Sequence, residues 1–262
     1  MIIMCRRTFM KNAKLNWVRL PIDNLENCRE LGGYETKYGQ QTKWHSFLRS
    51  SDLSGIEEKD IRFLKEYGVN TVIDLRRKNE IVKAKNPLSD TDFVDYHNIP
   101  FITDTISDIT KYYGKDQELT VSEFYIQLLN QKDSVKQIFE TIHFAKEGCI
   151  LFHCRVGKDR TGVLALLLLG LAGVRKKDII ANYEVSYSKL ESLHDFKQED
   201  TSLPLSFLYS NREYMMTAYE FIKNNYGTFE DYLLSTNLNP EIIEGVKARV
   251  IHDYSPHKLE LN

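Results

Sequence analysis

Hydrophobic and polar residues follow one another along the first half of the chain in a pattern that predicts helices and strands in alternation. Apolar residues recur at helical spacing over residues 56–67, and Gly68 provides a C-terminal stop for that helix. Ser54 and Glu57 have the spacing of a capping box, which predicts where the helix begins. An apolar, β-branched run then indicates a buried strand over residues 69–75.

The second half of the chain repeats this order around its most apolar segment. Residues 149–152 indicate a strand, and an apolar run over residues 163–174 follows after a polar loop. Because this run is shorter than the ~20 residues of a membrane-spanning helix, we expect a buried helix over residues 161–172. The pattern also predicts a short strand over residues 44–48 and helices over residues 121–129, 135–145, 177–190, 211–224, 228–235 and 240–251.

These elements indicate an α/β fold with a central, mainly parallel sheet and helices on both faces. We expect residues 1–20 to form an N-terminal arm, open to partial disorder, and residues 21–262 to form a single domain. Residues 83–118 are polar and only weakly periodic. A loop of that length usually has a function, so we hypothesise that it is a lid over a site.

The composition limits the class of protein further. Of the 262 residues, 42% are hydrophobic and 27% are charged, as in ordinary globular proteins. The net charge of -2 gives no overall attraction to nucleic acid or to a membrane, so we expect neither a nucleic-acid partner nor stable membrane insertion. The basic N-terminus lacks the apolar segment of a signal peptide. We therefore expect a cytoplasmic protein, with secretion by another route left open.

The cysteines do not suit a metal site or a set of disulfides. No C-x-x-C spacing occurs, which argues against zinc, and four cysteines are few for a disulfide framework in a chain of this length. We expect reduced thiols, no metal and no cofactor. The four residues are Cys5, Cys28, Cys149 and Cys154.

Residues 153–161, called the signature loop below, join the predicted strand to the predicted buried helix and read H-C-R-V-G-K-D-R-T. Cys154 precedes the helix, where unpaired backbone N–H groups favour bound anions and the thiolate form of a cysteine. Gly157 permits the loop to curl tightly. We expect residues 155–160 to surround one phosphate with their backbone N–H groups, and the substrate-binding residues among them are Arg155, Val156, Gly157 and Lys158.

Side chains of the same loop add further phosphate chemistry. Arg160, six residues after Cys154, can bind two phosphate oxygens at once through its planar guanidinium. Thr161 can donate its hydroxyl to the sulfur, and His153 is expected to order the loop rather than to act as a base. Lys158 is expected near the rim, where its ammonium would bind the reacting phosphate or a second, neighbouring one.

A second pair of residues has the same C-x5-R spacing. Cys149 and Arg155 are also six residues apart, but the segment between them is an apolar strand without glycine, which cannot curl around a phosphate. We therefore assign the nucleophile to Cys154.

The leaving oxygen needs a proton donor, and two aspartates are candidates. Asp159 lies in the signature loop, and Asp74 ends the strand that we expect beside the strand over residues 149–152. Asp74 can equally be a helix cap or an ion-pair partner of Arg76. Arg76 and Glu80 are four residues apart, which indicates either a surface ion pair that adds little stability or, as we expect, a buried ion pair near the site.

The pattern H-C-x-x-G-K-D-R-T-G resembles the signature of the bacterial atypical tyrosine phosphatases, also called triple-specificity phosphatases. The similarity extends over residues 27–251, with departures at Cys28, Glu30 and Asn182, where an aromatic residue, Asp and Asp are usual. The further matching segments are N-C-R-E-L-G-G-Y (27–34), F-L-R-S with Leu53 (47–53), V-I-D-L-R with Glu80 (72–80) and Y-G-T-F-E-D-Y-L (226–233).

The resemblance implies a cysteine-phosphatase fold and hydrolysis of phosphotyrosine through a phosphocysteine intermediate, with Asp159 as the general acid. It also implies an extension to phosphoserine, phosphothreonine and phosphoinositides, so the expected partner is a phosphorylated protein or a phosphoinositide. Two alternatives stay open: a dedicated phosphoinositide or inositol phosphate phosphatase, and a phosphate-binding module without turnover. The presence of Cys154, Arg160 and a loop aspartate argues against the module.

Overall fold

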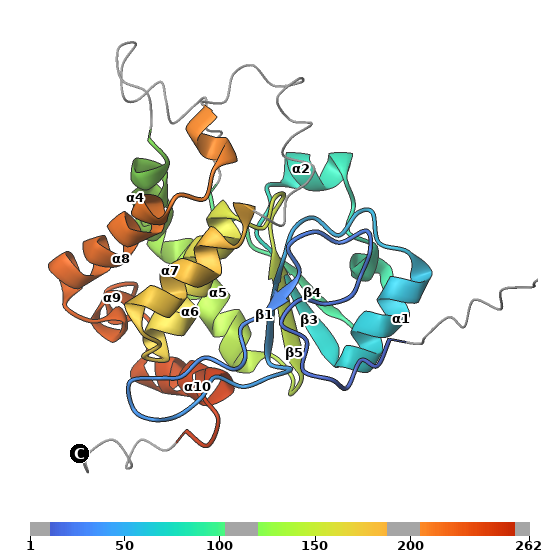
Figure 1. Ribbon diagram of the computed structural model, residues 1–262, viewed down its shortest axis with the longest axis horizontal. Helices are drawn as coiled ribbons and strands as arrows, with labels where there is room; N and C mark the ends of the chain where they lie inside the picture. The colour runs from blue at the N-terminus through green and yellow to red at the C-terminus, as the bar shows by residue number, and fades with distance from the viewer. Residues whose placement is uncertain (1–10, 103–119, 188–204, 255–262) are drawn as a thin grey trace, which may run out of the picture.

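The computed structural model describes residues 11–102, 120–187 and 205–254. At its centre is a five-stranded sheet in the order β1-β2-β5-β3-β4 (Figure 1). β1 pairs with β2 in antiparallel fashion, and the other neighbours are parallel. The sheet therefore confirms the predicted α/β class. Its strands are β1 (Arg29–Glu30), β2 (Phe47–Ser50), β3 (Val69–Asp74), β4 (Asp95–Asn98) and β5 (Cys149–His153).

Helices cover both faces of this sheet, as predicted. α1 lies on one face, and most of the other helices lie on the opposite face (Figure 1). Among the described residues, the α-helices are α1 (Glu58–Tyr67), α2 (Lys78–Lys83), α4 (Val121–Asn130), α5 (Lys132–Phe144), α6 (Asp159–Leu171), α7 (Lys176–Glu184), α8 (Arg212–Tyr226), α9 (Phe229–Leu234) and α10 (Pro240–Val250). Short 3-10 helices cover Pro87–Asp90 and Leu205–Leu208.

The helix α6 explains the most apolar segment of the sequence. Its residues from Thr161 to Leu169 are all buried, because the helix lies between the sheet and the outer helices. A helix enclosed on all sides has no polar face, unlike the amphipathic helices at a protein surface. Among the described residues, no helix has the length and apolar character needed to cross a membrane.

The start of α1 differs from the prediction. Glu57, not Ser54, is the N-cap, and its backbone N–H donates to the carboxylate of Asp60 at 3.0 Å. The capping box is therefore shifted by three residues. The predicted end is confirmed, since Gly68 takes a left-handed conformation with φ of 102°.

The long segment 83–118 contains regular structure that the sequence pattern did not show. Its first part forms the 3-10 helix and then β4, which extends the sheet beside β3. Residues 103–119 lie outside the described residues, and so do the residues of the predicted lid that fall there. Of the N-terminal arm, residues 11–20 are described, and Ala13 and Leu20 are buried in the core on the α1 side of the sheet.

Candidate active site

The signature loop leaves the sheet at the carboxyl end of its central strand. His153 ends β5 and pairs with Ser50 of β2 on one side and with Asp74 of β3 on the other. In open α/β sheets, ligands bind outside the carboxyl ends of the strands. The parallel strands thus place the loop and the ends of β2 and β3 at one edge.

The sulfur of Cys154 is almost enclosed and accepts a hydrogen bond. Cys154 is 2% exposed, and the backbone N–H of Gly157 donates to its Sγ at 3.3 Å. α6 begins only five residues later, at Asp159, so its unpaired N–H groups and positive dipole end are nearby. These features place hydrogen-bond donors and positive potential beside this sulfur. Cys149 lies within β5 instead, where burial raises the pKa of its thiol far above the ordinary value.

Gly157 gives the loop its shape. It has a φ of 71°, and a Cβ at this position would lie 2.5 Å from the carbonyl oxygen of Ser50. Its own carbonyl accepts hydrogen bonds from Asn27 at 3.0 Å and from Arg49 at 2.8 Å. In a trans peptide the carbonyl and the following N–H point in opposite directions. Holding the carbonyl of Gly157 therefore turns the N–H of Lys158 the other way.

Two buried arginines support the loop from behind without a carboxylate partner among the described residues. Arg49 donates to the side chain of Asn182 at 2.6 Å, and Arg29 donates to the carbonyl of Asn182 at 2.7 Å and to Ser186 at 2.9 Å. Burial lowers the pKa of Arg49 to about 10 and, together with the neighbouring Arg49, also lowers the pKa of Arg29. Their positive charge favours an anion in the adjacent loop. Asn182 is one of the departures from the family pattern.

Arg160 is held by Glu80 in a bidentate ion pair. Nη1 and Nη2 of Arg160 donate to the two oxygens of Glu80 at 2.8 and 2.9 Å, and Nη1 also reaches the carbonyl of Leu75 at 3.4 Å. A guanidinium has five N–H donors, so these three bonds leave the N–H of Nε and one of Nη2. Within the described residues, that pair of donors forms a free edge that suits two phosphate oxygens.

Asp159 is fixed through only one of its oxygens. Oδ1 accepts a hydrogen bond from the hydroxyl of Tyr125 at 2.7 Å and lies 3.2 Å from Nζ of Lys158. The side chain is 20% exposed, and Oδ2 has no hydrogen-bond partner among the described residues. One oxygen is thus held in place while the other is available to a substrate.

Lys158 does not lie at the rim as predicted. Its side chain is fully buried, and Nζ donates to the carbonyls of Phe207 at 2.6 Å and Tyr209 at 2.9 Å. The expectation of an exposed charge is therefore wrong, because backbone carbonyls and the carboxylate of Asp159 surround the ammonium. Lys158 instead connects the signature loop to the segment before α8.

Asp74 is enclosed in a network of donors. It is fully buried, accepts four hydrogen bonds from Arg76 and one from Tyr96 at 2.6 Å, and lies 3.3 Å from Nε2 of His153. Burial alone would raise its pKa, but His153 and Arg76 outweigh this and lower it well below the ordinary value. A carboxylate held in this way is a poor proton donor, so the geometry favours Asp159 as the general acid.

The predicted ion pair between Arg76 and Glu80 is also wrong. Arg76 pairs with Asp74 and with Asp52 at 2.8 Å, whereas Glu80 pairs with Arg160 and with Arg77. The spacing of four residues does not bring Arg76 and Glu80 together, because Arg76 precedes α2 and points back into the sheet edge.

The other predicted residues take up varied positions. His153 is buried and contacts Asp74 and Asn86, in keeping with a structural role. Thr161 is buried, and its hydroxyl has no partner among the described residues, so the expected bond to the sulfur is not formed here. The side chain of Arg155 is exposed and that of Val156 is half-buried. Within the described residues, no cluster of three or more His, Cys, Asp or Glu side chains could hold a metal ion.

Comparison with known proteins supports the resemblance. A model of the tyrosine phosphatase family matches residues 20–252. A tyrosine-protein phosphatase of Nostoc commune is 37% identical over 147 residues, which are 56% of this chain and 50% of that protein. The chain thus matches half the length of this relative. The triple specificity protein phosphatase PtpB of Mycobacterium tuberculosis is 22% identical over 246 residues, 77% of this chain and 89% of that protein.

Solved structures also align with the chain at low similarity. The crystal structure of TpbA from P. aeruginosa gives a TM-score of 0.37 and 12% identity over 86% of this chain and 99% of that one.

Proposed function

Because the chain belongs to the tyrosine phosphatase family, we propose that it hydrolyses phosphate monoesters, phosphotyrosine first among them, through a phosphocysteine intermediate on Cys154. The observation that carries the proposal is the arrangement of the signature loop. A sulfur that accepts an amide hydrogen bond, an anchored Arg160 with a free edge, and Asp159 with one free oxygen all lie on it.

In the first step, the thiolate of Cys154 attacks phosphorus. The S–P bond forms, the bond from phosphorus to the leaving oxygen breaks, and the carboxyl of Asp159 gives its proton to that oxygen. The two free donors of Arg160 and the N–H groups at the start of α6 bind the phosphoryl oxygens. Their contribution is greatest where charge develops in the transition state.

In the second step, a water molecule attacks the phosphocysteine. The carboxylate of Asp159 takes a proton from this water, the S–P bond breaks, and the products are inorganic phosphate and the Cys154 thiolate. The amide of Gly157 stabilises the departing sulfur, a role that the sequence assigned to Thr161.

A wider substrate range is part of the proposal. The triple-specificity name of the mycobacterial relative supports activity on phosphoserine and phosphothreonine. One argument for phosphoinositide activity does not hold, because the ammonium of Lys158 is enclosed and cannot bind a second phosphate at the rim. Phosphotyrosine is therefore the preferred substrate of the proposal.

Two cysteine variants test the nucleophile. Cys154→Ser is expected to abolish phosphate release from a phosphotyrosine peptide while retaining its binding, because Arg160 and the loop amides remain. Cys149→Ser is the matched control and is expected to keep turnover near that of the wild type. Loss of activity in the control but not in Cys154→Ser would refute the assignment. A panel of phosphoserine and phosphothreonine peptides and phosphoinositides then defines the range, and activity on lipids alone would favour the dedicated lipid phosphatase.

A further inference from the structure

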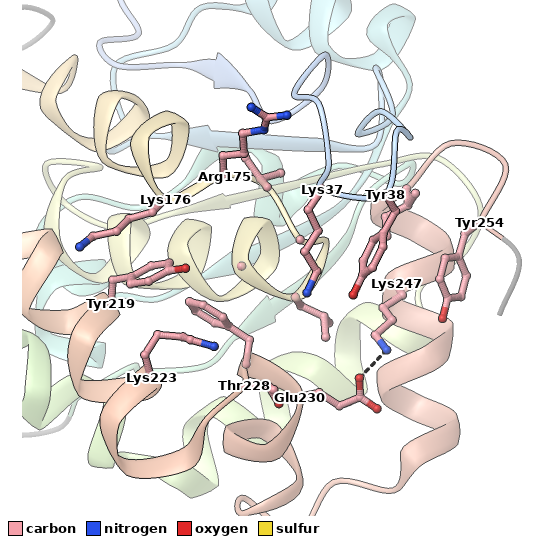
Figure 2. A pocket seen from close by; sticks show the side chains of 16 residues that line it. Lys37, Tyr38, Arg175, Lys176, Tyr219, Lys223, Thr228, Glu230, Lys247 and Tyr254 are labelled. Carbon is pink, nitrogen blue, oxygen red and sulfur yellow. Dashed lines mark hydrogen bonds and ion pairs between the residues drawn. The ribbon is translucent and has the colours of Figure 1, made fainter. Parts of the chain in front are cut away.

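A second concave site lies at the far end of α6 from the signature loop. Its cavity has a volume of about 250 Å³ and is bounded by the last turn of α6, the start of α7 and parts of α8, α9 and α10 (Figure 2). α6 has 13 residues, which at ~1.5 Å per residue places its two ends about 20 Å apart. The cavity is therefore separate from the proposed catalytic centre, and the inference below does not depend on the proposed function.

Positive charge is concentrated in the lining of this cavity. Although the whole chain has a net charge of -2, the lining contains five cationic side chains and one carboxylate, that of Glu230. A concave surface lined by charge of one sign raises the local concentration of oppositely charged ligands. The cationic residues are Lys37, Arg175, Lys176, Lys223 and Lys247.

Three of these cations are already paired with carboxylates. Lys247 contacts Glu230 at 2.6 Å and Glu244 at 2.7 Å, and is thereby fixed in the wall. Lys176 pairs with a glutamate of α8, and Arg175 with a glutamate of the loop before β2 at 3.6 Å. Their charge is partly neutralised, so they contribute less to the binding of a ligand.

The remaining two cations have no carboxylate partner among the described residues. Nζ of Lys37 lies 4.7 Å above the centre of the Tyr38 ring, and Nζ of Lys223 donates to the carbonyl of Gly227. Neither contact cancels the positive charge. Figure 2 shows the ammonium groups of Lys37 and Lys223 pointing into the cavity from different walls, with the hydroxyl of Tyr38 beside Lys37.

Aromatic rings give the cavity a rigid floor. A Cβ at Gly170 would lie 2.4 Å from the ring of Phe229, so this ring rests directly on the backbone of α6. Tyr219 packs edge-on against Phe229, with ring centres 5.4 Å apart. The floor is thus preformed, which reduces the ordering that a ligand must impose on the protein.

We propose that this cavity binds a compact ligand with two or more phosphate groups, held mainly by Lys37 and Lys223. Two uncompensated charges on different walls suit a ligand with several anionic groups better than one with a single anion. Lysine ammonium groups act as flexible point charges and adapt to different phosphate spacings. Such a ligand is either a free polyphosphorylated molecule or the headgroup of a phosphorylated lipid.

Isothermal titration of the full chain with inositol hexakisphosphate tests the proposal, in the Cys154→Ser background and at constant ionic strength because the attraction is salt-dependent. The double variant Lys37→Ala with Lys223→Ala is called the pocket variant. At about 1 kcal/mol per lysine, it should bind the probe roughly thirtyfold more weakly. The matched control, Lys14→Ala with Lys59→Ala, removes the same charge from exposed positions and should leave the affinity unchanged. Arg160→Ala should also leave it unchanged.

An equal loss of affinity in the pocket variant and in the Lys14→Ala, Lys59→Ala control would overturn the proposal, since binding would then follow net charge alone. Loss in Arg160→Ala but not in the pocket variant would place the ligand at the signature loop and would also overturn it. Unchanged thermal unfolding of the pocket variant, and unchanged phosphotyrosine turnover when the same two lysine substitutions are made with Cys154 intact, show that the substitutions do not disturb the fold.

Vesicle sedimentation separates the two sources of ligand. Phosphatidylcholine vesicles with and without phosphatidylinositol bisphosphate are compared for the wild type and the pocket variant. Sedimentation that requires both the bisphosphate lipid and the two lysines identifies a lipid headgroup, whereas binding of the soluble probe alone identifies a free ligand. Binding of neither overturns the proposal.

Discussion

The ion pair between Glu80 and Arg160 gives the sharpest prediction about the proposed reaction. Glu80→Gln preserves the size of the side chain but removes its charge and one of the two acceptors for the guanidinium. Arg160 would remain in place without being held at a fixed angle. We expect kcat/KM to fall by about 100-fold, the cost of a misplacement of roughly 1 Å.

The same pair contributes to stability in a way that depends on pH. Burial opposes the charge of Glu80, but the hydrogen bonds and charge of Arg160, with help from Arg77, lower its pKa from 4.5 to about 2. A lowered pKa stabilises the fold above the unfolded-state value, and this stability is lost as the pH falls towards 2. The shift corresponds to about 3 kcal/mol at neutral pH, as an upper bound.

Two measurements check these expectations. The first is kcat/KM for an aryl phosphate at neutral pH, and the second is the unfolding midpoint between pH 7 and pH 3. Glu80→Gln should lose activity and should lose less stability on acidification than the wild type does. Glu58→Gln is the matched control, because Glu58 is exposed and its ion-pair partner among the described residues is Arg62 at 3.4 Å. Wild-type activity in Glu80→Gln would refute the idea that the ion pair orients Arg160.

Three further predictions concern other residues of the signature loop. Gly157→Ala should abolish turnover, because its Cβ would clash with the end of β2. Gly39 is the control, since it has a similar φ of 74° and open space around it; Gly39→Ala should lower the free energy of unfolding by only about 1–2 kcal/mol, measured with denaturant. Asp159→Asn should slow esters with poor leaving groups far more than aryl phosphates in a leaving-group series, and Asp74→Asn should mainly lower the unfolding midpoint; the reverse pattern would make Asp74 the acid. Lys158→Met should destabilise the fold by roughly 1–3 kcal/mol, because the carbonyls that Lys158 contacts would lose their donor. It should also reduce kcat/KM equally for phosphotyrosine and phosphoinositide substrates. A loss of kcat/KM on the lipid alone would contradict the buried position of Lys158.

The elements predicted correctly from the sequence are those with a strong apolar signal. β5 and α6 are almost entirely buried, and so is β3 except for Asn70, so runs rich in apolar and β-branched residues were enough to locate them. β4 was missed because its residues, D-Y-H-N, are polar and largely half-exposed at the edge of the sheet. Such a strand is specified by pairing with β3 rather than by its own pattern.

The candidate site was also predictable only in part. The order of residues around Cys154 was informative because the loop is local in sequence. The partners of Lys158 and Arg160 could not be predicted because they come from distant segments, and two of them, at Phe207 and Tyr209, are backbone carbonyls that any residue provides. Glu80 was noticed but was paired with its near neighbour Arg76, since helical spacing favours local partners.

The carbonyl partners of Lys158 also have a consequence for biosynthesis. They belong to residues 49 and 51 positions further along the chain. At a translation rate of about 5–20 residues per second, they leave the ribosome roughly 3–10 s after the lysine does. During that interval the nascent signature loop has its cysteine and arginine but lacks the contacts that enclose the ammonium beside Asp159. The nascent chain therefore acquires the loop's sequence well before it can complete the loop's structure.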